Sequence, residues 1–314
     1  MARILINDGI HKTGLEKLQA AGHEVDTVKI SQEDLPAQLP AYQAICVRSA
    51  TKVREDLINL CPDLKVIGRG GVGLDNIDVD HAKSKGIEVV NTPAASSRSV
   101  AELVFAHLFS ISRFVYKSNR HMPNDGREEF KALKKSYSKG FELKGKTLGI
   151  IGIGRIGQET AKIALGVGME VVCVDPYATA PKVTMSFAGQ DMEVELPLVS
   201  MDKMLGQADV ITLHIPFSGS PVLSTTEFSK MKDGVVLINA ARGGTVDEEA
   251  LLTALNDEKV LAAGLDVFEN EPTPREDLLQ HPNVSCTPHI GASTGEAQEN
   301  IGIELADKLI AILG

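Results

Sequence analysis

The sequence predicts an α/β fold in which two doubly wound parallel sheets are each covered by helices on both faces. Three observations support this prediction. The chain has 314 residues, of which 43% are hydrophobic, enough to bury two cores rather than one. Short apolar runs alternate with longer segments of helical period, which is typical of parallel strands joined by helices. The alternation restarts near residue 146, so we expect two such domains in one chain.

The strands of each series are expected where the apolar runs fall. Those of the first series occupy residues 2–8, 23–28, 41–48, 65–70 and 87–92. Those of the second occupy residues 146–154, 169–175, 209–216, 234–241, 260–268 and 283–289. The segment SVAELVFAHLFSISRF (99–114) is apolar on more than one face, which predicts a buried or interface helix. An amphipathic helix is expected over residues 294–314.

Apolar residues alternate on both sides of Gly189-Gln190-Asp191 within residues 181–200. This pattern predicts a β-hairpin. We assign it no chemistry, because surface loops tolerate insertions.

Composition disfavours several classes of partner. A net charge of -10 and 4% aromatic residues, without tryptophan, argue against a nucleic-acid groove. The four cysteines form no CxxC pair, so neither a metal site nor a disulfide framework is predicted, and a reducing cytoplasm is expected. No apolar run approaches the roughly 20 residues of a membrane span, and the N-terminal MARILINDG lacks the apolar core of a signal peptide.

A glycine-rich turn opens the second series. Gly152, Gly154 and Gly157 form G-x-G-x-x-G between a strand and the helical segment RIGQETAKIAL. These glycines permit a tight turn, close approach of the backbone to a pyrophosphate, and close packing of helix on strand. The first helical amides, those of Arg155 and Ile156, would face the phosphates. The pattern predicts a Rossmann domain that binds a dinucleotide.

The next predicted strand ends on Asp175, close to the spacing of about 20 residues expected for a ribose-binding carboxylate. Such a carboxylate accepts hydrogen bonds from both ribose hydroxyls of NAD and repels the 2′-phosphate of NADP. We therefore predict NAD as the cofactor. The alternative is a glycine-rich turn in an unrelated α/β protein.

Three polar side chains follow strands of the second series, at the sheet edge where ligands bind in such folds. Arg242 can fork onto a carboxylate. Glu271 precedes Pro272, which favours extended geometry. His289 carries the side chain best suited to exchanging a hydroxyl proton near neutral pH. Taken singly, each could be a surface ion pair or a structural hydrogen bond, but their shared position favours one catalytic site. The remaining histidines, including His11, His81, His107 and His281, lack this context.

At these residues, and along nearly its whole length, the chain resembles the D-isomer-specific 2-hydroxyacid dehydrogenases. The segments that carry the resemblance are VRSATKV, GRGGVGLDNID, NTPAASSRSVAEL, GKTLGIIGIGRIG, NAARGGTVDE, LDVFENEP and TPHIGAST. The resemblance implies a flavodoxin-like substrate domain, residues 1–92 with 290–314, which closes by hinge motion on an inserted Rossmann domain, residues 93–289. It also implies a homodimer.

The resemblance further implies roles for individual residues. His289 is implied as the acid/base, Glu271 as its carboxylate partner, and Arg242 as the anchor of the substrate carboxylate and carbonyl. The implied cofactor contacts, with the glycine-rich turn, are Arg155, Ile156, Asp175, His214, Ile215, Ala240, Arg242, Asp266, His289, Gly291 and Ala292. The implied substrate contacts are the backbone amides of Gly71, Val72 and Gly73, together with Arg242 and His289.

Within the family, the chain is most similar to the phosphoglycerate dehydrogenases, in a short form without a C-terminal regulatory domain. Arg48 and Arg69 match arginines of that branch and would bind the phosphate of 3-phospho-D-glycerate. The expected reaction is then the reversible NAD-dependent oxidation of 3-phospho-D-glycerate to 3-phosphohydroxypyruvate, the first step of L-serine biosynthesis. The alternatives are a hydroxypyruvate or glyoxylate reductase and, in another class, an NAD-sensing corepressor. Contacts from Lys134 or Lys135 are less favoured than a solvated helix face.

Overall fold

The computed structural model describes residues 1–314, which form two compact units. The first unit comprises residues 1–99 and 292–314, and the second comprises residues 100–291. Both are α/β units built on a parallel sheet, as the sequence predicts. The divisions fall a few residues after the expected 92/93 and 289/290.

The first unit contains a five-stranded parallel sheet with the order β2-β1-β3-β4-β5, the doubly wound order of flavodoxin-like folds. The strands are β1 (Arg3–Ile6), β2 (Glu24–Asp26), β3 (Ala44–Val47), β4 (Val66–Arg69) and β5 (Glu88–Asn91). The helices are α1 (Lys12–Ala20), α2 (Leu35–Gln38), the 3₁₀ turn η1 (Leu39–Ala41), α3 (Glu55–Asn59), α4 (Val79–Ser84) and α13 (Gly295–Leu313).

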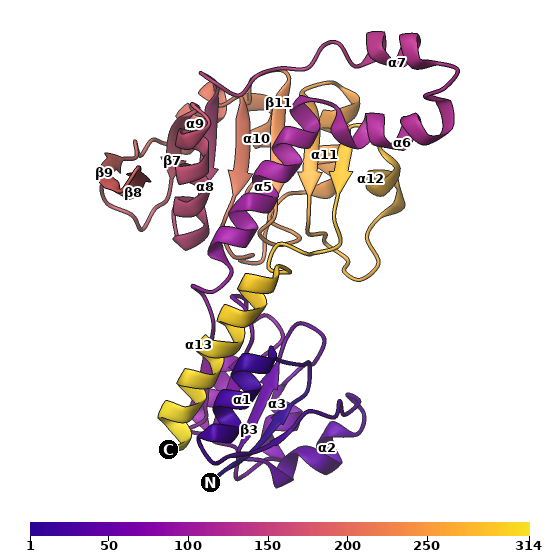
Figure 1. Cartoon of the computed structure of the whole chain (residues 1–314). Coiled ribbons are helices and arrows are strands. Elements are labelled where there is room, and N and C mark those ends of the chain that lie inside the picture. Colours follow the sequence, from indigo (N-terminus) through magenta and orange to yellow (C-terminus); the bar gives the residue numbers. More distant parts are fainter. The chain divides into compact units, whose positions relative to one another are not determined.

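Helix α13, drawn in yellow in Figure 1, belongs to the first unit although it comes last in the chain. It packs with α1 against one face of the sheet, where Leu305 and Leu309 join Leu18 in a buried cluster. The two helices touch at Gly14 and Gly302, since a Cβ at Gly14 would lie only 2.5 Å from the Gly302 carbonyl oxygen. The opposite face is covered by α2, α3 and α4.

The second unit contains a six-stranded parallel sheet with the order β13-β12-β11-β10-β6-β7. Its strands are β6 (Thr147–Ile151), β7 (Glu170–Val174), β10 (Val210–Leu213), β11 (Val235–Asn239), β12 (Val260–Leu265) and β13 (Val284–Cys286). Its helices are α5 (Ser97–Ser112), α6 (Val115–Asp125), α7 (Phe130–Ser136), α8 (Arg155–Gly166), α9 (Met201–Gln207), α10 (Thr225–Lys230), α11 (Glu248–Asn256) and α12 (Glu276–Gln280). Helix α5 begins three residues before the division between the units.

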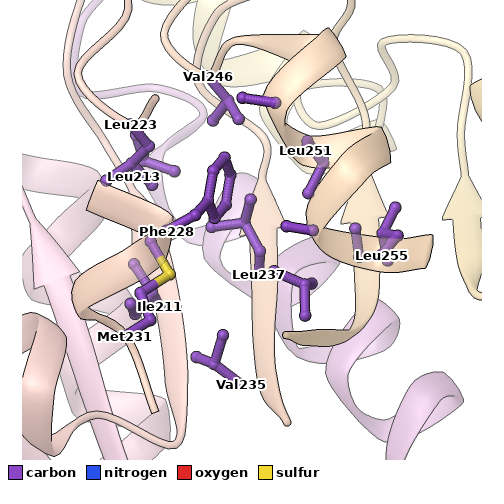
Figure 2. Close-up of a cluster of buried hydrophobic side chains, with 14 of the residues drawn as sticks. Ile211, Leu213, Leu223, Phe228, Met231, Val235, Leu237, Val246, Leu251 and Leu255 are labelled. Atoms are coloured by element: carbon purple, nitrogen blue, oxygen red, sulfur yellow. The ribbon is translucent and has the colours of Figure 1, made fainter. Parts of the chain in front are cut away.

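The two faces of this sheet form two separate cores because successive strand residues point to opposite sides. On β11, Val236 and Ile238 pack with α5 and α8, whereas Val235 and Leu237 pack beneath α9, α10 and α11. Figure 2 shows the second of these cores, in which the Phe228 ring lies among aliphatic side chains from the strands and from α11. Burial on both faces explains why the strands appear in the sequence as continuous apolar runs.

The predicted hairpin is present as β8 (Lys182–Phe187) and β9 (Gln190–Glu195). Its turn falls at Ala188 and Gly189, both with positive φ, one residue before the predicted centre. Phe187 pairs with Gln190, so the loop has two residues, and a two-residue turn with positive φ matches the twist of the flanking strands. After β9 the chain pairs with the edge strand β7 through Cys173 and Leu198.

Helix α5 confirms the expectation of a buried helix, since Val104, Phe105, Leu108 and Ile111 enter the core of the second unit. No single helix is long and apolar enough to cross a membrane. Helices α5 and α6, which meet at a bend of 58°, reach the length and apolar composition of a span only when taken together.

Candidate active site

The glycine-rich turn lies at the point where the strand order of the second sheet reverses, between β6 and β10. Gly152 has φ +90°, and a Cβ there would meet the His214 carbonyl oxygen at 2.7 Å. A Cβ at Gly157 would overlap the Gly152 carbonyl oxygen, so this glycine sets the close approach of α8 to the turn. The space beside Gly154 is open, and α8 begins directly after it without a side-chain cap. Exposed amides above an open glycine fit a pyrophosphate.

Asp175 lies just past the end of β7, facing the same turn. Its Oδ2 accepts a hydrogen bond of 2.9 Å from the Ile153 amide, and its Oδ1 accepts one of 2.9 Å from the Tyr177 amide. These two bonds fix the carboxylate, and each oxygen retains acceptor capacity for a ribose hydroxyl. The geometry therefore fits the adenosine half of a dinucleotide.

His289 and Glu271 form a hydrogen-bonded pair at the carboxyl ends of β13 and β12. The distance from His289 Nδ1 to Glu271 Oε2 is 2.7 Å, and the two side chains are 43% and 34% exposed. Because Nδ1 is directed at the carboxylate, Nε2 is the ring nitrogen available to a ligand. Glu271 Oε1 accepts a second bond, of 3.0 Å, from the Phe268 amide, and the Glu271–Pro272 peptide bond is cis.

The environment of Glu271 keeps its carboxylate charged. Burial alone would raise the pKa of Glu271, but the hydrogen bonds from His289 and from the Phe268 amide outweigh it and lower that pKa below its ordinary value. The charges of His289 and Arg242 act in the same direction. A carboxylate that stays ionised can orient the imidazole and stabilise its protonated form.

Arg242 lies on a loop that is fixed by its own backbone contacts. Asn239 Nδ2 and Thr245 Oγ1 both donate to the Arg242 carbonyl oxygen, at 3.1 and 2.7 Å. A Cβ at Gly243 would overlap the Phe268 carbonyl oxygen, so Gly243 allows this loop to approach the one that carries Glu271. The loops after β11 and β12 are thus packed together, and Arg242 is close enough to influence the charge of Glu271.

Asp266, just past β12, organises the loop that carries His289. Its Oδ1 accepts the Ile290 amide and its Oδ2 accepts the Gly291 amide, both at 2.8 Å. Both of its carboxylate oxygens are therefore bonded to the protein, and Asp266 is 1% exposed. The carboxylate thus holds the loop from within and is shielded from a ligand by its burial.

His214 is placed differently from the other predicted contacts. Its ring faces α8, with Nε2 3.2 Å from Thr160 Oγ1, and only its backbone lies beside Gly152. Burial lowers the pKa of His214 to about 3, so the ring is neutral at any working pH. The His214 ring therefore cannot supply a proton.

In the first unit, the predicted substrate contacts lie at the end of β4 and on the turn after it, apart from Arg48, which follows β3. Gly71 has φ +139°, and a Cβ there would overlap the Arg69 guanidinium, which therefore lies directly over the Gly71 backbone. Arg48 Nη1 donates a 2.6 Å hydrogen bond to Gln298 Oε1, and Gln298 in turn donates to the Ala292 carbonyl oxygen. Arg69 is thus placed over the turn, but the Gly71 amide, predicted to bind substrate, donates instead to Thr92 Oγ1 at 2.8 Å. Arg48 bonds to Gln298 near the start of α13.

Two further features were not expected from the sequence. A largely apolar cavity of about 400 Å³ adjoins the His289–Glu271 pair, lined by residues of the same loops with Leu279 and Cys286. His107, to which no role was assigned, is buried against Ser285 and Thr287 of the loop that carries His289. No three His, Cys, Asp or Glu side chains are placed to hold a metal.

Comparisons with known proteins agree with this geometry. Residues 105–291 match the family model described as the D-isomer specific 2-hydroxyacid dehydrogenase, NAD binding domain. The chain is 43% identical to a hydroxypyruvate reductase of Thermotoga maritima, over 99% of this chain and 98% of that protein. It is 39% identical to a D-3-phosphoglycerate dehydrogenase of Archaeoglobus fulgidus over 98% of this chain, but spans only 56% of that relative's length.

Among solved structures, a glyoxylate reductase from Paecilomyes thermophila is 29% identical. It aligns with a TM-score of 0.84 over 98% of this chain and 94% of that one. The two parallel sheets, the dinucleotide turn and these full-length similarities lead to one conclusion. The chain belongs to the D-isomer-specific 2-hydroxyacid dehydrogenases and is an NAD(P)-dependent enzyme of that family.

Proposed function

We propose that this enzyme reduces hydroxypyruvate and glyoxylate to the corresponding 2-hydroxy acids with NADH, by reversible hydride transfer. The observation that carries the proposal is the 43% identity to a hydroxypyruvate reductase across nearly the full length of both chains. The similarity in fold to a glyoxylate reductase supports the same choice.

The acid/base step is assigned to the His289–Glu271 pair. When bound, the nicotinamide supplies the hydride that forms the new bond at C2 of the keto acid. In the same reduction, protonated His289 gives its Nε2 proton to the carbonyl oxygen and becomes neutral, and it regains a proton from solvent. Glu271, whose carboxylate stays ionised, stabilises the protonated imidazole through the 2.7 Å bond to Nδ1.

Arg242 and the turn after β4 are assigned to anion binding. A guanidinium is not a general base, so Arg242 is assigned to hold the substrate carboxylate and to polarise the C2 oxygen. The amides of Val72 and Gly73, with Arg69 lying over Gly71, are assigned to the carboxylate, whereas the Gly71 amide already donates to Thr92 Oγ1 at 2.8 Å. Both assignments are part of the proposal.

A second candidate substrate is 3-phospho-D-glycerate, oxidised to 3-phosphohydroxypyruvate. The observation in its favour is that Arg48, just after β3, lies beside the turn that follows Arg69: Arg48 Cγ is 3.7 Å from where a Cβ would stand at Gly70. Against it, the Arg48 guanidinium already bonds to Gln298, so phosphate would have to displace or share that partner. We therefore rank it second.

The substrate choice is tested with a panel of acids, measured through NADH absorbance. Hydroxypyruvate and glyoxylate are expected to give a kcat/KM at least about tenfold above that of 3-phosphohydroxypyruvate, since phosphate would have to compete with Gln298 for the Arg48 guanidinium. The Arg48→Ala variant should change the KM for hydroxypyruvate little.

The matched control is Arg54→Ala, which removes another arginine of the first unit, one paired with Asp78. A preference for the phosphorylated acid that is lost in Arg48→Ala and kept in Arg54→Ala would transfer the protein to the second candidate. Tight binding of NADH without turnover of any acid would instead favour the corepressor class.

The preference for NAD over NADP is also proposed, and it rests on Asp175. Removing this carboxylate in Asp175→Ala is expected to lower kcat/KM with NADH about 10- to 100-fold, the usual effect of losing hydrogen bonds to a charged group. The value with NADPH should not fall, because the repulsion of the 2′-phosphate disappears as well. Initial rates with both cofactors measure the two effects.

The exposed Asp191→Ala on the hairpin is the control for a change in charge alone. An equal loss with both cofactors would mean that the variant has only disturbed the turn that Asp175 holds, and the assignment would be abandoned.

The homodimer and the cytoplasmic location remain proposals. The four cysteines, which are all free thiols, are compatible with a reducing compartment.

A further inference from the structure

His107 lies on α5, far from the site in sequence, yet it is tied to the loop that carries His289. Its side chain is almost fully buried, with 3% of the residue exposed. Nδ1 is 3.0 Å from Ser285 Oγ, and Nε2 is 3.0 Å from Thr287 Oγ1. Both partners belong to the segment that ends β13, two and four residues before His289, and all of them lie in the second unit.

The protons of this network have one consistent arrangement. Thr287 Oγ1 donates its only proton to Asp266 Oδ1, at 2.6 Å. Toward His107 it must therefore accept, so the proton of the imidazole is on Nε2 and Nδ1 accepts from the Ser285 hydroxyl. Burial lowers the pKa of His107, which agrees with a neutral ring.

The network ends on the backbone next to His289. Asp266, which receives the Thr287 proton, also accepts the amides of Ile290 and Gly291, the two residues that follow His289. His289 itself has φ +54°, a left-handed conformation that is unfavourable for a residue other than glycine and has to be held by its surroundings. The amide bonds to Asp266 supply that restraint directly after the strained residue.

The packing around His107 is also specific to it. A Cβ added at Gly264 of β12 would lie 2.7 Å from His107 Cβ, so α5 approaches the strand at the distance that only glycine permits. This approach brings the ring within reach of both Ser285 and Thr287. The buried polar groups are thereby paired rather than left unsatisfied.

We propose that His107 is a positioning residue for the reaction: through Thr287 and Asp266 it fixes the turn that holds His289 in its working conformation. The proposal rests on the acid/base role proposed for His289. His107 touches neither substrate nor cofactor. Its contribution is the Nε2 proton that fixes the orientation of the Thr287 hydroxyl, and with it the acceptor geometry of Asp266.

Two substitutions separate this role from simple core packing. His107→Gln places an amide nitrogen near the former Nε2 and keeps the donor to Thr287, whereas His107→Asn keeps a polar group only near the former Nδ1, toward Ser285. His107→Leu fills the space without either bond. We expect kcat for hydroxypyruvate reduction to fall about five- to tenfold in the Asn and Leu variants and to recover to within about twofold of the original in the Gln variant.

A second readout does not depend on turnover. Hydrogen exchange at the amides of Ile290 and Gly291 should become about five- to tenfold faster in the Asn and Leu variants, and not in the Gln variant, because those amides lose a fixed acceptor. Val104→Ala, a buried change on the same helix outside the network, is the control. It should lower stability while leaving kcat and both amides unchanged.

Equal behaviour of the Gln and Asn variants, or unchanged exchange at residues 290 and 291, would overturn the proposal. If the original protein turns over none of the acids, the proposed function fails, yet the exchange pattern still decides whether His107 fixes this turn.

Discussion

Replacing His289 with asparagine is expected to lower kcat by about 10²- to 10⁴-fold, the usual contribution of a positioned general acid or base. Asparagine keeps a group that can hydrogen bond near Nδ1 but has no atom that can carry the transferred proton. Because Glu271 retains its bond from the Phe268 amide, the loop after β12 should keep its shape. Steady-state kinetics with hydroxypyruvate and NADH, together with fluorescence titration of NADH, measure the effect.

His281→Asn is the matched control. His281 is a partly buried histidine of the same unit, whose Nδ1 accepts the Asn283 amide at 3.2 Å, away from the Glu271 carboxylate. Its replacement should leave kcat nearly unchanged. If His289→Asn kept more than about a tenth of the original kcat, the proton would have to come from another group and the acid/base assignment would be wrong.

The largest effect on stability is expected for Leu237→Ala. Leu237 lies on the central strand β11, is fully buried, and is one of the side chains enclosed by β10, α10 and α11 in Figure 2. Truncation removes buried methyl groups and leaves a cavity in a core that is packed from both sides, which costs about 2–5 kcal/mol. Urea denaturation followed by circular dichroism measures the loss.

Leu261→Ala on the neighbouring strand removes the same atoms from a side chain that is 46% exposed. Its cost in stability is expected to stay at about 0.5 kcal/mol, as for most surface positions. Similar losses in the two variants would mean that the core in Figure 2 does not govern the stability of this unit.

Most of the fold could be predicted from the sequence because the patterns that specify its strands and turns each lie within a short stretch of the chain. The inner strands of the second sheet, such as β10 and β11, are buried on both faces and so appear as uninterrupted apolar runs. The spacing of Gly152, Gly154 and Gly157 is likewise a pattern within a few residues of the chain. Arg242, Glu271 and His289 could be named because a parallel sheet brings the ends of its strands to one edge. The 2.7 Å bond between His289 and Glu271 follows from the meeting of two loops, which no spacing in the sequence encodes.

What the sequence did not predict depends on contacts between distant segments. His107 has no motif around it, and its role emerges only when α5 packs on Gly264 and meets Thr287. The prediction of the substrate depended on a distant contact in the same way. Arg48 was expected to bind a phosphate, but its guanidinium bonds to the Gln298 side chain, which comes from the far end of the chain. In both cases the partner is separated by more than a hundred residues.

The place of α13 in the first unit has a consequence for synthesis of the protein. One face of the β1–β3–β4 sheet is closed by Leu305 and Leu309, which a ribosome makes after every residue of the second unit. During translation the second unit can therefore complete its core while the first still exposes an open apolar face. The core of the first unit is therefore completed only when the last helix of the chain has been made.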